Sequence, residues 1–227
     1  MDQTFRARRI DNMWDFLKTC NLHSCIVRRL QDTSFYRIIE IGRLQLDWSL
    51  IIALIEQWRP ETHTFHLPIG DAIITLHDVE VLYGLSVDAL PVALPHAMRE
   101  YMRDQYLETL QCLTGFRPAD EGALVGASRL VLTPVRLHLE AMHADITDNT
   151  PDLHSNRYTR LLLLFGGVLF PNTLGNLVSL RFLHHLERLD NLHWYNWGAA
   201  ILGYLYWQMC RACMGTQQDV AGFMLLL

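Results

Sequence analysis

Residues 58–85, WRPETHTFHLPIGDAIITLHDVEVLYGL, constrain the fold most, because they carry stop, turn and start signals in close succession. Pro60 ends a preceding helix, since its ring fixes φ and disfavours helical geometry at the residue before it. Residues 61–67 are rich in Thr, Phe and His, which favours a strand. The turn residues Pro68, Gly70 and Asp71 then let the chain return as a short second strand over residues 72–75. The pattern predicts a β-hairpin across about residues 61–75.

A helix is predicted directly after this hairpin. The Thr75 hydroxyl can accept a hydrogen bond from the first amides of the helix, and Asp78 is placed to reach back, which is the capping-box pattern. Gly84 is suited to the left-handed conformation that ends many helices. Apolar residues between these two signals recur at helical spacing: Leu76, Val79, Leu82 and Tyr83.

The rest of the chain predicts helices joined by loops. Asp47 is placed to cap a helix over residues 48–58, and the Thr-Pro pairs at 133–134 and 150–151 begin two more. Further helices are predicted over the following ranges: 95–113, 178–189 and from 197 onward. Residues 114–127, which contain several glycines, predict a surface loop. The fold class is therefore mainly α, a multi-helix globular domain with one small β-hairpin.

Two features of the later helices need an explanation. Gly166 and Gly167 lie inside a predicted helix, where each costs about 1 kcal/mol relative to Ala; a close crossing with another helix explains them. Residues 191–210 form an uncharged run that is long enough to cross a bilayer. His193 and Gln208 interrupt the run, so a buried core helix is the preferred interpretation.

Charge divides the chain at about residue 43. The net charge of −5 lacks the basic excess with which a generic nucleic-acid binder neutralises phosphates. Residues 1–43 hold 8 Arg and Lys against 5 Asp and Glu (+3), whereas residues 44–227 hold 11 against 19 (−8). We predict an N-terminal helical extension over residues 1–43 and one globular domain over residues 44–227. Contact with a polyanion would begin in the extension.

The sequence does not predict a catalytic site or a metal site. An odd count of 5 cysteines and a start without an apolar leader favour free thiols in a reducing compartment. Cys210 and Cys213 lie late in an apolar helix, which favours core packing, with a metal site or a redox pair as alternatives. His63 and His66 would point to opposite faces of a strand, so they could not share a metal ion.

Three ordered segments of this chain resemble the plant mobile domain, also called the aminotransferase-like plant mobile domain or the MAINTENANCE OF MERISTEMS-like (MAIN-like) family. They are residues 58–85, residues 162–175 (LLLFGGVLFPNTLG) and residues 195–212 (YNWGAAILGYLYWQMCRA). Members often carry Pro and Gly where this chain has Ser86 and Ala89. Relatives usually continue beyond the apolar run that ends at Leu227, so the resemblance implies a plant mobile domain over residues 44–227 that is truncated at its C-terminal end.

This resemblance implies a non-enzymatic protein-interaction module in the nucleus. Its expected role is in transposon silencing, genome stability and meristem maintenance, beside a phosphatase-like partner of the protein phosphatase 7 type. The aminotransferase label would require a lysine that holds pyridoxal phosphate as a Schiff base. Lys18 is the only lysine, and no Gly-rich phosphate-binding segment lies near it, so we expect no cofactor. The motif residues expected to build the core or to contact the partner are Trp58, Arg59, Pro60, Glu61, His63, Phe65 and His66.

A second hypothesis is a transposon-derived nucleic-acid-binding domain. Its contacts would come from N-terminal arginines, with a solvated basic arm as the simpler interpretation. The arginines concerned are Arg6, Arg8, Arg9, Arg28 and Arg29. An enzyme finds less support, because the chain has no Gly-x-Ser-x-Gly nucleophile elbow and no recognisable order of carboxylates for a transposase-type metal site.

Overall fold

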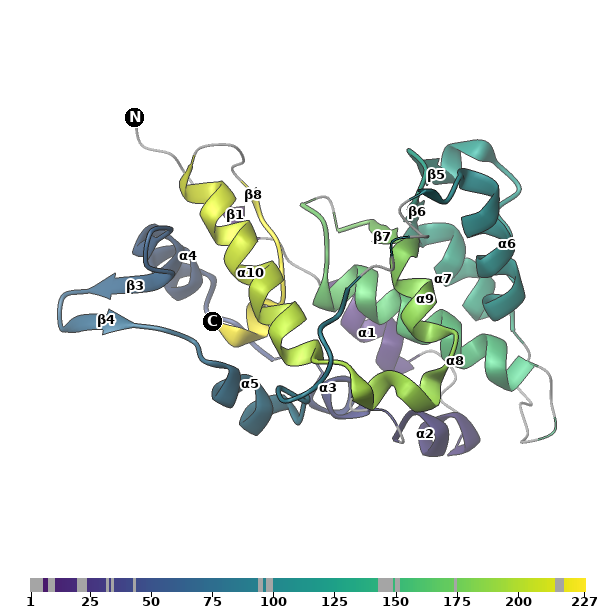
Figure 1. Ribbon diagram of the computed structural model, residues 1–227, viewed down its shortest axis with the longest axis horizontal. Coiled ribbons are helices and arrows are strands. Elements are labelled where there is room, and N and C mark those ends of the chain that lie inside the picture. The colour runs from purple at the N-terminus through teal and green to yellow at the C-terminus, as the bar shows by residue number, and fades with distance from the viewer. Residues whose placement is uncertain are drawn as a thin grey trace.

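The computed structural model describes residues 6–7, 11–19, 24–31, 33, 35–42, 44–93, 96, 100–142, 149, 152–173, 175–214 and 219–227. Helices dominate it, which confirms the predicted mainly α class (Figure 1). The α-helices are α1 (Asp11–Thr19), α2 (Ser24–Gln31), α3 (Tyr36–Ile41), α4 (Trp48–Glu56), α5 (Leu76–Tyr83), α6 (Arg103–Thr114), α7 (Leu132–Ala141), α8 (Asp152–Leu164), α9 (Leu183–Leu186) and α10 (Trp197–Cys213). The shorter turns are the 3₁₀ helices η2 (Glu121–Ala123), η4 (Leu180–Phe182), η5 (Leu189–Trp194) and η6 (Met224–Leu226) and the π-helix η3 (Phe165–Leu169).

The strands form small separate sheets. They are β1 (Arg6–Ala7), β2 (Trp58–Arg59), β3 (Thr64–Leu67), β4 (Gly70–Ala72), β5 (Leu124–Val125), β6 (Arg129–Val131), β7 (Leu177–Ser179) and β8 (Asp219–Val220). The predicted hairpin is present as β3 and β4, but the second strand was wrongly placed. It covers residues 70–72 and not 72–75, because Leu67 pairs with Gly70 and only Pro68 and Ile69 form the turn. β2 adds a third antiparallel strand to the hairpin. The sequence did not predict the antiparallel sheet β5-β6-β7 or the parallel pair of β1 and β8.

One half of the molecule is built around α8. This helix contacts α1, α2, α6, α7 and α9, and residues 161–165 are fully buried. A helical segment that is apolar all round, as residues 161–165 are, must be covered on every side. Gly166 and Gly167 continue it into η3, where an added Cβ would lie 2.4 Å from Cβ of Val178 in β7 and 2.5 Å from Cγ of Met13 in α1. These glycines therefore permit a close approach, as predicted, to a strand as well as to a helix.

The other half is built around α10. This helix contacts α4, α5, β2 and β8, and the β3–β4 hairpin projects from this end of the molecule (Figure 1). An aromatic cluster joins the two halves: the Phe165 ring centroid lies 5.0 Å from that of Trp197 and 5.0 Å from that of Phe35. Since all three side chains are buried, both halves share one hydrophobic core.

Some of the predicted helix signals are confirmed and others were wrong. The helix predicted over residues 48–58 ends at Glu56, and Pro60 does not end it, because Trp58 and Arg59 pair as β2. The helix predicted to start at Thr133 begins at Leu132 without a side-chain cap. The Asp47 carboxylate accepts from the amides of Ser49 and Leu50 at 2.9 and 3.2 Å and caps α4. At the start of α5, the Thr75 hydroxyl accepts from the Asp78 amide at 3.2 Å, while the Asp78 carboxylate accepts from the Thr75 amide at 2.7 Å. Gly84 ends α5 with φ of 66°.

The predicted helix over residues 178–189 was wrong. The chain begins there as β7, because Arg129 to Val131 of β6 offer a ladder of backbone partners, with Arg129 opposite Ser179. It then passes through η4, α9 and η5, whose successive turns bury the recurring leucines. The predicted 114–127 loop was also wrong in part, since it contains η2 and β5. In the described residues, the helix predicted over 95–113 begins only at Arg103.

Candidate functional site

The family motif anchors the projecting sheet to α10. Trp58 is 2% exposed; its indole N–H donates to the Cys210 sulfur at 3.3 Å, and its ring lies 4.8 Å from that of Tyr206. Phe65, opposite Trp58 in the β2–β3 ladder, packs against it at 5.0 Å. These two motif residues are therefore part of the core, and they hold the hairpin in place.

The remaining motif residues lie at the surface or near it. Pro60 is half-buried, and Arg59, Glu61, His63 and His66 are exposed. Arg59 lies in β2, Pro60, Glu61 and His63 lie in the turn between β2 and β3, and His66 lies in β3.

The two motif histidines are separated, but not by strand alternation as predicted, because His63 lies in the turn before β3. His63 adopts a φ of 55°, and its ring stacks on Tyr206 with an interplanar angle of 14°. His66 lies in β3, and its Nδ1 is 2.8 Å from a carboxylate oxygen of Asp71 in β4. Within the described part of the chain, no group of three His, Cys, Asp or Glu side chains is placed to hold a metal ion.

Cys210 and Cys213 face the motif from α10. The Cys213 thiol donates to the backbone carbonyls of Ile55 and Trp58 at 3.7 and 3.8 Å. Burial and the neighbouring Cys210 raise the pKa of the Cys213 thiol, and Arg59 partly offsets that rise. A raised pKa keeps the thiol protonated, whereas a reactive cysteine needs a lowered one. Both sulfurs contact the motif, Cys210 through the Trp58 indole and Cys213 through two backbone carbonyls, which agrees with the preferred interpretation of core packing.

Large apolar side chains are exposed along the hairpin and α5. In the sequence they follow one another from the hairpin turn to the end of α5. The hairpin projects from the molecule, whereas α5 lies against α10 (Figure 1). Their exposed fractions are Ile69 95%, Ile73 51%, Leu76 38%, Val81 61% and Leu82 52%. Exposed apolar side chains on a projecting hairpin are candidates for an interaction surface.

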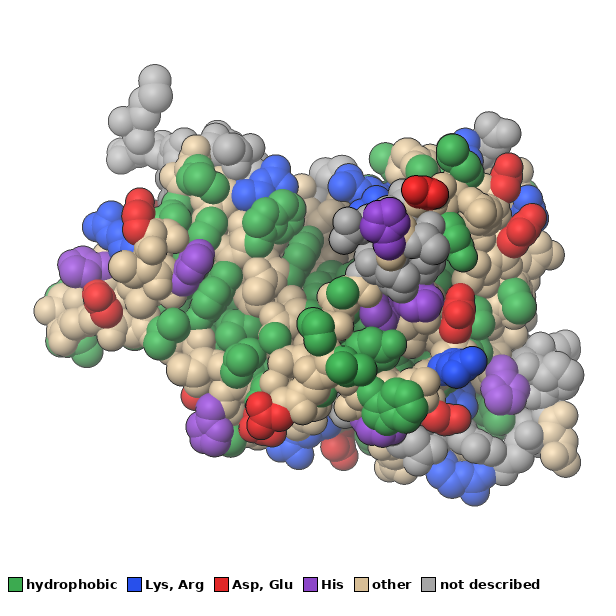
Figure 2. Space-filling model, in the orientation of Figure 1, with side chains coloured by type: hydrophobic (Ala, Val, Ile, Leu, Met, Phe, Trp, Pro, Cys, Tyr) green, Lys and Arg blue, Asp and Glu red, His purple; other side chains and the backbone are tan. Residues whose placement is uncertain are grey.

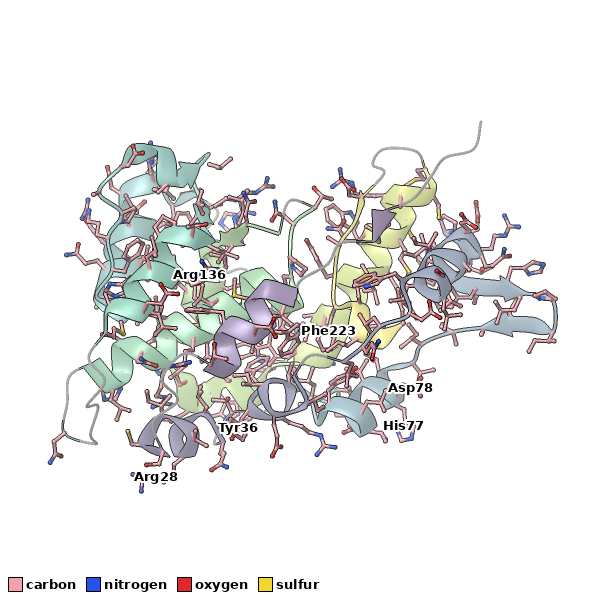
Figure 3. The ribbon with its side chains drawn as sticks, turned by 180° about the vertical axis from the view of Figure 1, so that it is seen from behind. Arg28, Tyr36, His77, Asp78, Arg136 and Phe223 are labelled. Atoms are coloured by element: carbon pink, nitrogen blue, oxygen red, sulfur yellow. The ribbon has the colours of Figure 1, made fainter. Side chains whose placement is uncertain are left out.

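The structure does not bring the N-terminal arginines together into a described site. The backbone of Arg6 lies in β1, and Arg28 lies exposed on the outer side of α2 (Figure 3). Arg29 is also in α2, but the structure does not describe its side chain. Arg8 and Arg9 lie outside the described residues. Lys18 lies in α1, and its side chain is likewise not described. The nucleic-acid hypothesis built on these arginines stays a prediction.

Sequence reasoning missed a groove of about 570 Å³ between α10 and the β5-β6-β7 sheet. Three arginines line it: Arg129 from β6, Arg181 from η4 and Arg211 from α10. The other lining residues are Val125, Ser128, Phe170, Asn172, Thr173, Leu177, Val178, Ser179, Phe182, Tyr204, Trp207 and Gln208. Figure 2 shows cationic side chains on both sides of the hollow between α10 and this sheet.

Hydrogen bonds and ring contacts hold the groove wall in shape. The Tyr204 hydroxyl donates to the Pro171 carbonyl at 2.8 Å and accepts from the Gln208 amide at 2.8 Å. Burial raises the pKa of Tyr204, and the hydrogen bond from Gln208 and the charges of Arg129 and Arg211 partly offset that rise. Both arginines are therefore close enough to influence one hydroxyl in the wall. The sequence offered only a weak indication of this site: each of the three arginines is the single charged residue of a short, largely apolar segment.

Sequence comparison defines the class of this mainly helical domain. The family model of the plant mobile domain matches residues 34–227. The chain belongs to the plant mobile domain family, which confirms the resemblance seen in the three motifs. No solved structure matches this chain.

Its relatives in Arabidopsis thaliana are larger proteins. The chain is 34% identical over 188 residues to Protein MAIN-LIKE 1, with 83% of this chain and 36% of that protein covered. It is 32% identical over 187 residues to Protein MAINTENANCE OF MERISTEMS, with 82% of this chain and 37% of that protein covered. It is also 32% identical over 206 residues to a Serine/threonine-protein phosphatase 7 long form homolog, with 91% of this chain and 15% of that protein covered. The chain thus spans between 15% and 37% of the length of these relatives.

The uncharged run at the C-terminal end lies mainly in α10, whose residues pack on four other elements. Among the described helices, none combines the length and the hydropathy that a membrane span needs.

Proposed function

We propose that this protein is a non-enzymatic protein-interaction module that acts in the nucleus. In this proposal it takes part in transposon silencing, genome stability and meristem maintenance. The observation that carries the interaction role is the exposure of apolar side chains on the hairpin and α5, from Ile69, which is 95% exposed, to Leu82, which is 52% exposed. Desolvating such side chains against a partner contributes about 25 cal/mol per Å² of apolar area buried.

The hairpin is suited to present these side chains. Trp58 and Phe65 anchor its base in the core, and the pair of His66 and Asp71 links its two strands. A surface that is already ordered loses less conformational entropy when a partner binds. The side chains of Ile69 and Ile73 are thus held on a fixed backbone.

The proposed partner is a phosphatase-like protein. Support comes from the relative named a Serine/threonine-protein phosphatase 7 long form homolog, which contains a segment related to this chain together with a much longer remainder. Domains joined in one polypeptide meet at a high effective concentration. A separate plant mobile domain chain would need a binding surface to achieve the same association.

Affinity purification from plant nuclei tests this function. The tagged full chain should recover a phosphatase-like or chromatin protein, and replacing Ile69 and Ile73 by Gln should reduce that recovery about tenfold or more. Leu137→Gln is the matched control, since Leu137 is 55% exposed on α7 in the other half of the molecule. Recovery of neither kind of protein by the unaltered chain would contradict the proposal.

The absence of enzymatic activity is a separate part of the proposal. An absorbance scan for pyridoxal phosphate and an elemental analysis of the purified protein test it directly. A bound cofactor, or an aldimine at Lys18, would refute the non-enzymatic interpretation.

A further inference from the structure

The groove between α10 and the β5-β6-β7 sheet has an unbalanced charge. Arg129 and Arg181 are exposed and Arg211 is half-buried, and the described residues that line the groove include no Asp or Glu. This is unusual in a chain whose residues 44–227 carry 19 carboxylates against 11 cationic side chains. Cationic side chains that line a groove give it a positive potential, which attracts anions.

Aromatic side chains lie beside these arginines. Phe170 and Phe182 stack with ring centroids 4.6 Å apart, and Tyr204 meets Phe170 edge-on at 5.5 Å. Trp207 is 50% exposed, and the Arg211 guanidinium lies 4.8 Å from the centre of its ring. A ligand in the groove would therefore meet an apolar surface as well as positive charge.

The two walls of the groove are joined to each other. In the sheet, Arg129 pairs with Ser179, and the Leu180 amide donates to the Ser128 carbonyl at 2.7 Å, which places Arg129 and Arg181 at the same end of the sheet. From α10, the Tyr204 hydroxyl donates to the Pro171 carbonyl in the segment that leads into β7. A site built in this way needs little reorganisation to bind.

These features favour an acidic peptide over a nucleic acid. A nucleic-acid strand carries a charge at every nucleotide and needs a long basic surface, whereas these arginines form a local group on a chain of net charge −5. The volume of about 570 Å³ accommodates a few side chains. The Asn172 side-chain oxygen already accepts from the amides of Asn176 and Leu177, so the Ser179 hydroxyl is the polar group that suits a peptide backbone. The arginines are suited to carboxylates through paired N–H donors.

We propose that this groove binds a short acidic segment of a protein partner, with Asp or Glu carboxylates on Arg129, Arg181 and Arg211 and an apolar side chain against Phe182 and Trp207. This inference rests on the proposed interaction function and assigns part of that function to a second surface, separate from the hairpin. It predicts that the partner carries an acidic stretch that includes at least one aromatic or large aliphatic residue.

Fluorescence polarisation with the full chain tests the proposal. The probe is a fluorescein-labelled synthetic peptide of Glu residues around a single Phe, and the same peptide with Gln in place of Glu is the neutral control. The Glu peptide should bind more tightly, and its affinity should fall as salt is raised. Arg129→Gln and Arg181→Gln should each weaken it about tenfold, since one charge-assisted contact contributes that much.

Arg188→Gln is the matched control, because Arg188 is exposed but lies outside the groove; it should leave the affinity unchanged. Trp207→Ala should weaken the Glu-Phe peptide more than a peptide of Glu alone. Because Arg181 is exposed, Arg181→Gln should keep the thermal stability of the unaltered chain, so a loss of peptide affinity in this variant reports the lost contact and not unfolding. That comparison keeps the test valid if a combined variant does not fold.

Three results would overturn the inference. They are equal affinity for the Glu and Gln peptides, unchanged Glu-peptide affinity in Arg129→Gln and Arg181→Gln, and tighter, arginine-dependent binding of a labelled single-stranded oligonucleotide. The failure of this inference can be distinguished from the failure of the proposed function. If nuclear purification with the Arg129→Gln, Arg181→Gln chain recovers the same partners as the unaltered chain, the interaction function stands and the groove assignment falls.

Discussion

Acidification should destabilise this protein through His185. The side chain is 5% exposed and lies edge-on to Tyr195, with 4.6 Å between ring centroids. Burial, and to a smaller extent the charge of His184, lower the pKa of His185 from 6.5 to about 4. Below pH 6.5 the unfolded chain therefore binds a proton that the folded chain does not accept until about pH 4. The contribution of neutral His185 to the free energy of unfolding is complete above pH 6.5, falls as the pH decreases, and is fully lost below about pH 4.

The pKa values set the size of this effect. One pH unit between the folded and unfolded pKa corresponds to about 1.36 kcal/mol, so the full loss is about 3 kcal/mol. Between about pH 7.5 and about pH 5, the free energy of unfolding should fall by about 2 kcal/mol from this group alone. This range lies above the pKa of ordinary carboxyl groups, so their protonation contributes little to the change.

Urea unfolding at several pH values between these limits measures the effect. His185→Leu should reduce the decline in the free energy of unfolding by about 2 kcal/mol, because the neutral side chain takes up no proton in either state. His154 is exposed on α8, so His154→Gln serves as the control and should keep the decline of the unaltered chain. An equal decline in His185→Leu and the unaltered chain would refute the assignment to His185.

Three further substitutions test the packing and capping of the fold by urea unfolding at neutral pH. Gly166→Ala should lower the free energy of unfolding by about 3 kcal/mol, since the new Cβ would lie 2.4 Å from Cβ of Val178. Gly203 lies in α10, and an added Cβ there would have nothing within 4 Å. Gly203→Ala should therefore raise the free energy of unfolding by up to about 1 kcal/mol. A loss comparable to that of Gly166→Ala would contradict the packing argument. Thr75→Ala should cost about 1 kcal/mol by removing the cap of α5, and an unchanged stability would show that the capping box contributes nothing.

Signals that are satisfied within a few residues could be predicted from the sequence. The caps at Asp47 and Thr75 and the helix end at Gly84 each depend on partners two to four positions away, and the structure has all of them. The β3–β4 hairpin is of the same kind, because its turn lies between its own strands. Such features need no information about the rest of the fold.

The sheet β5-β6-β7 depends on distant parts of the chain. Its central pairing joins Arg129 to Ser179 across α7 and α8. Residues 177–179 carry no alternating pattern, and the leucines that follow at roughly helical spacing made a helix the better local prediction. The error therefore came from a tertiary contact that overrode a local preference.

The groove could not be predicted for the same reason. The three arginines are far apart in the sequence: Arg129, Arg181 and Arg211. Each lies among uncharged, largely apolar residues, so its sequence context indicates only a single surface charge. They meet only because β7 lies beside β6 and because Tyr204 ties α10 to the segment before β7. A prediction that missed β7 necessarily missed the site that β7 helps to build.

The motif that identifies the family and the surfaces proposed to bind partners have different physical requirements. Trp58 is fixed by contacts with Phe65, Tyr206 and Cys210, so replacing it would leave a cavity in the core. Ile69 has almost no contact to lose, because it is 95% exposed. Two plant mobile domains can therefore share the buried motif and the fold while differing in the side chains of the hairpin tip and the groove. It follows that the identity of a partner has to be sought in those exposed residues, since the motif specifies the scaffold that carries them.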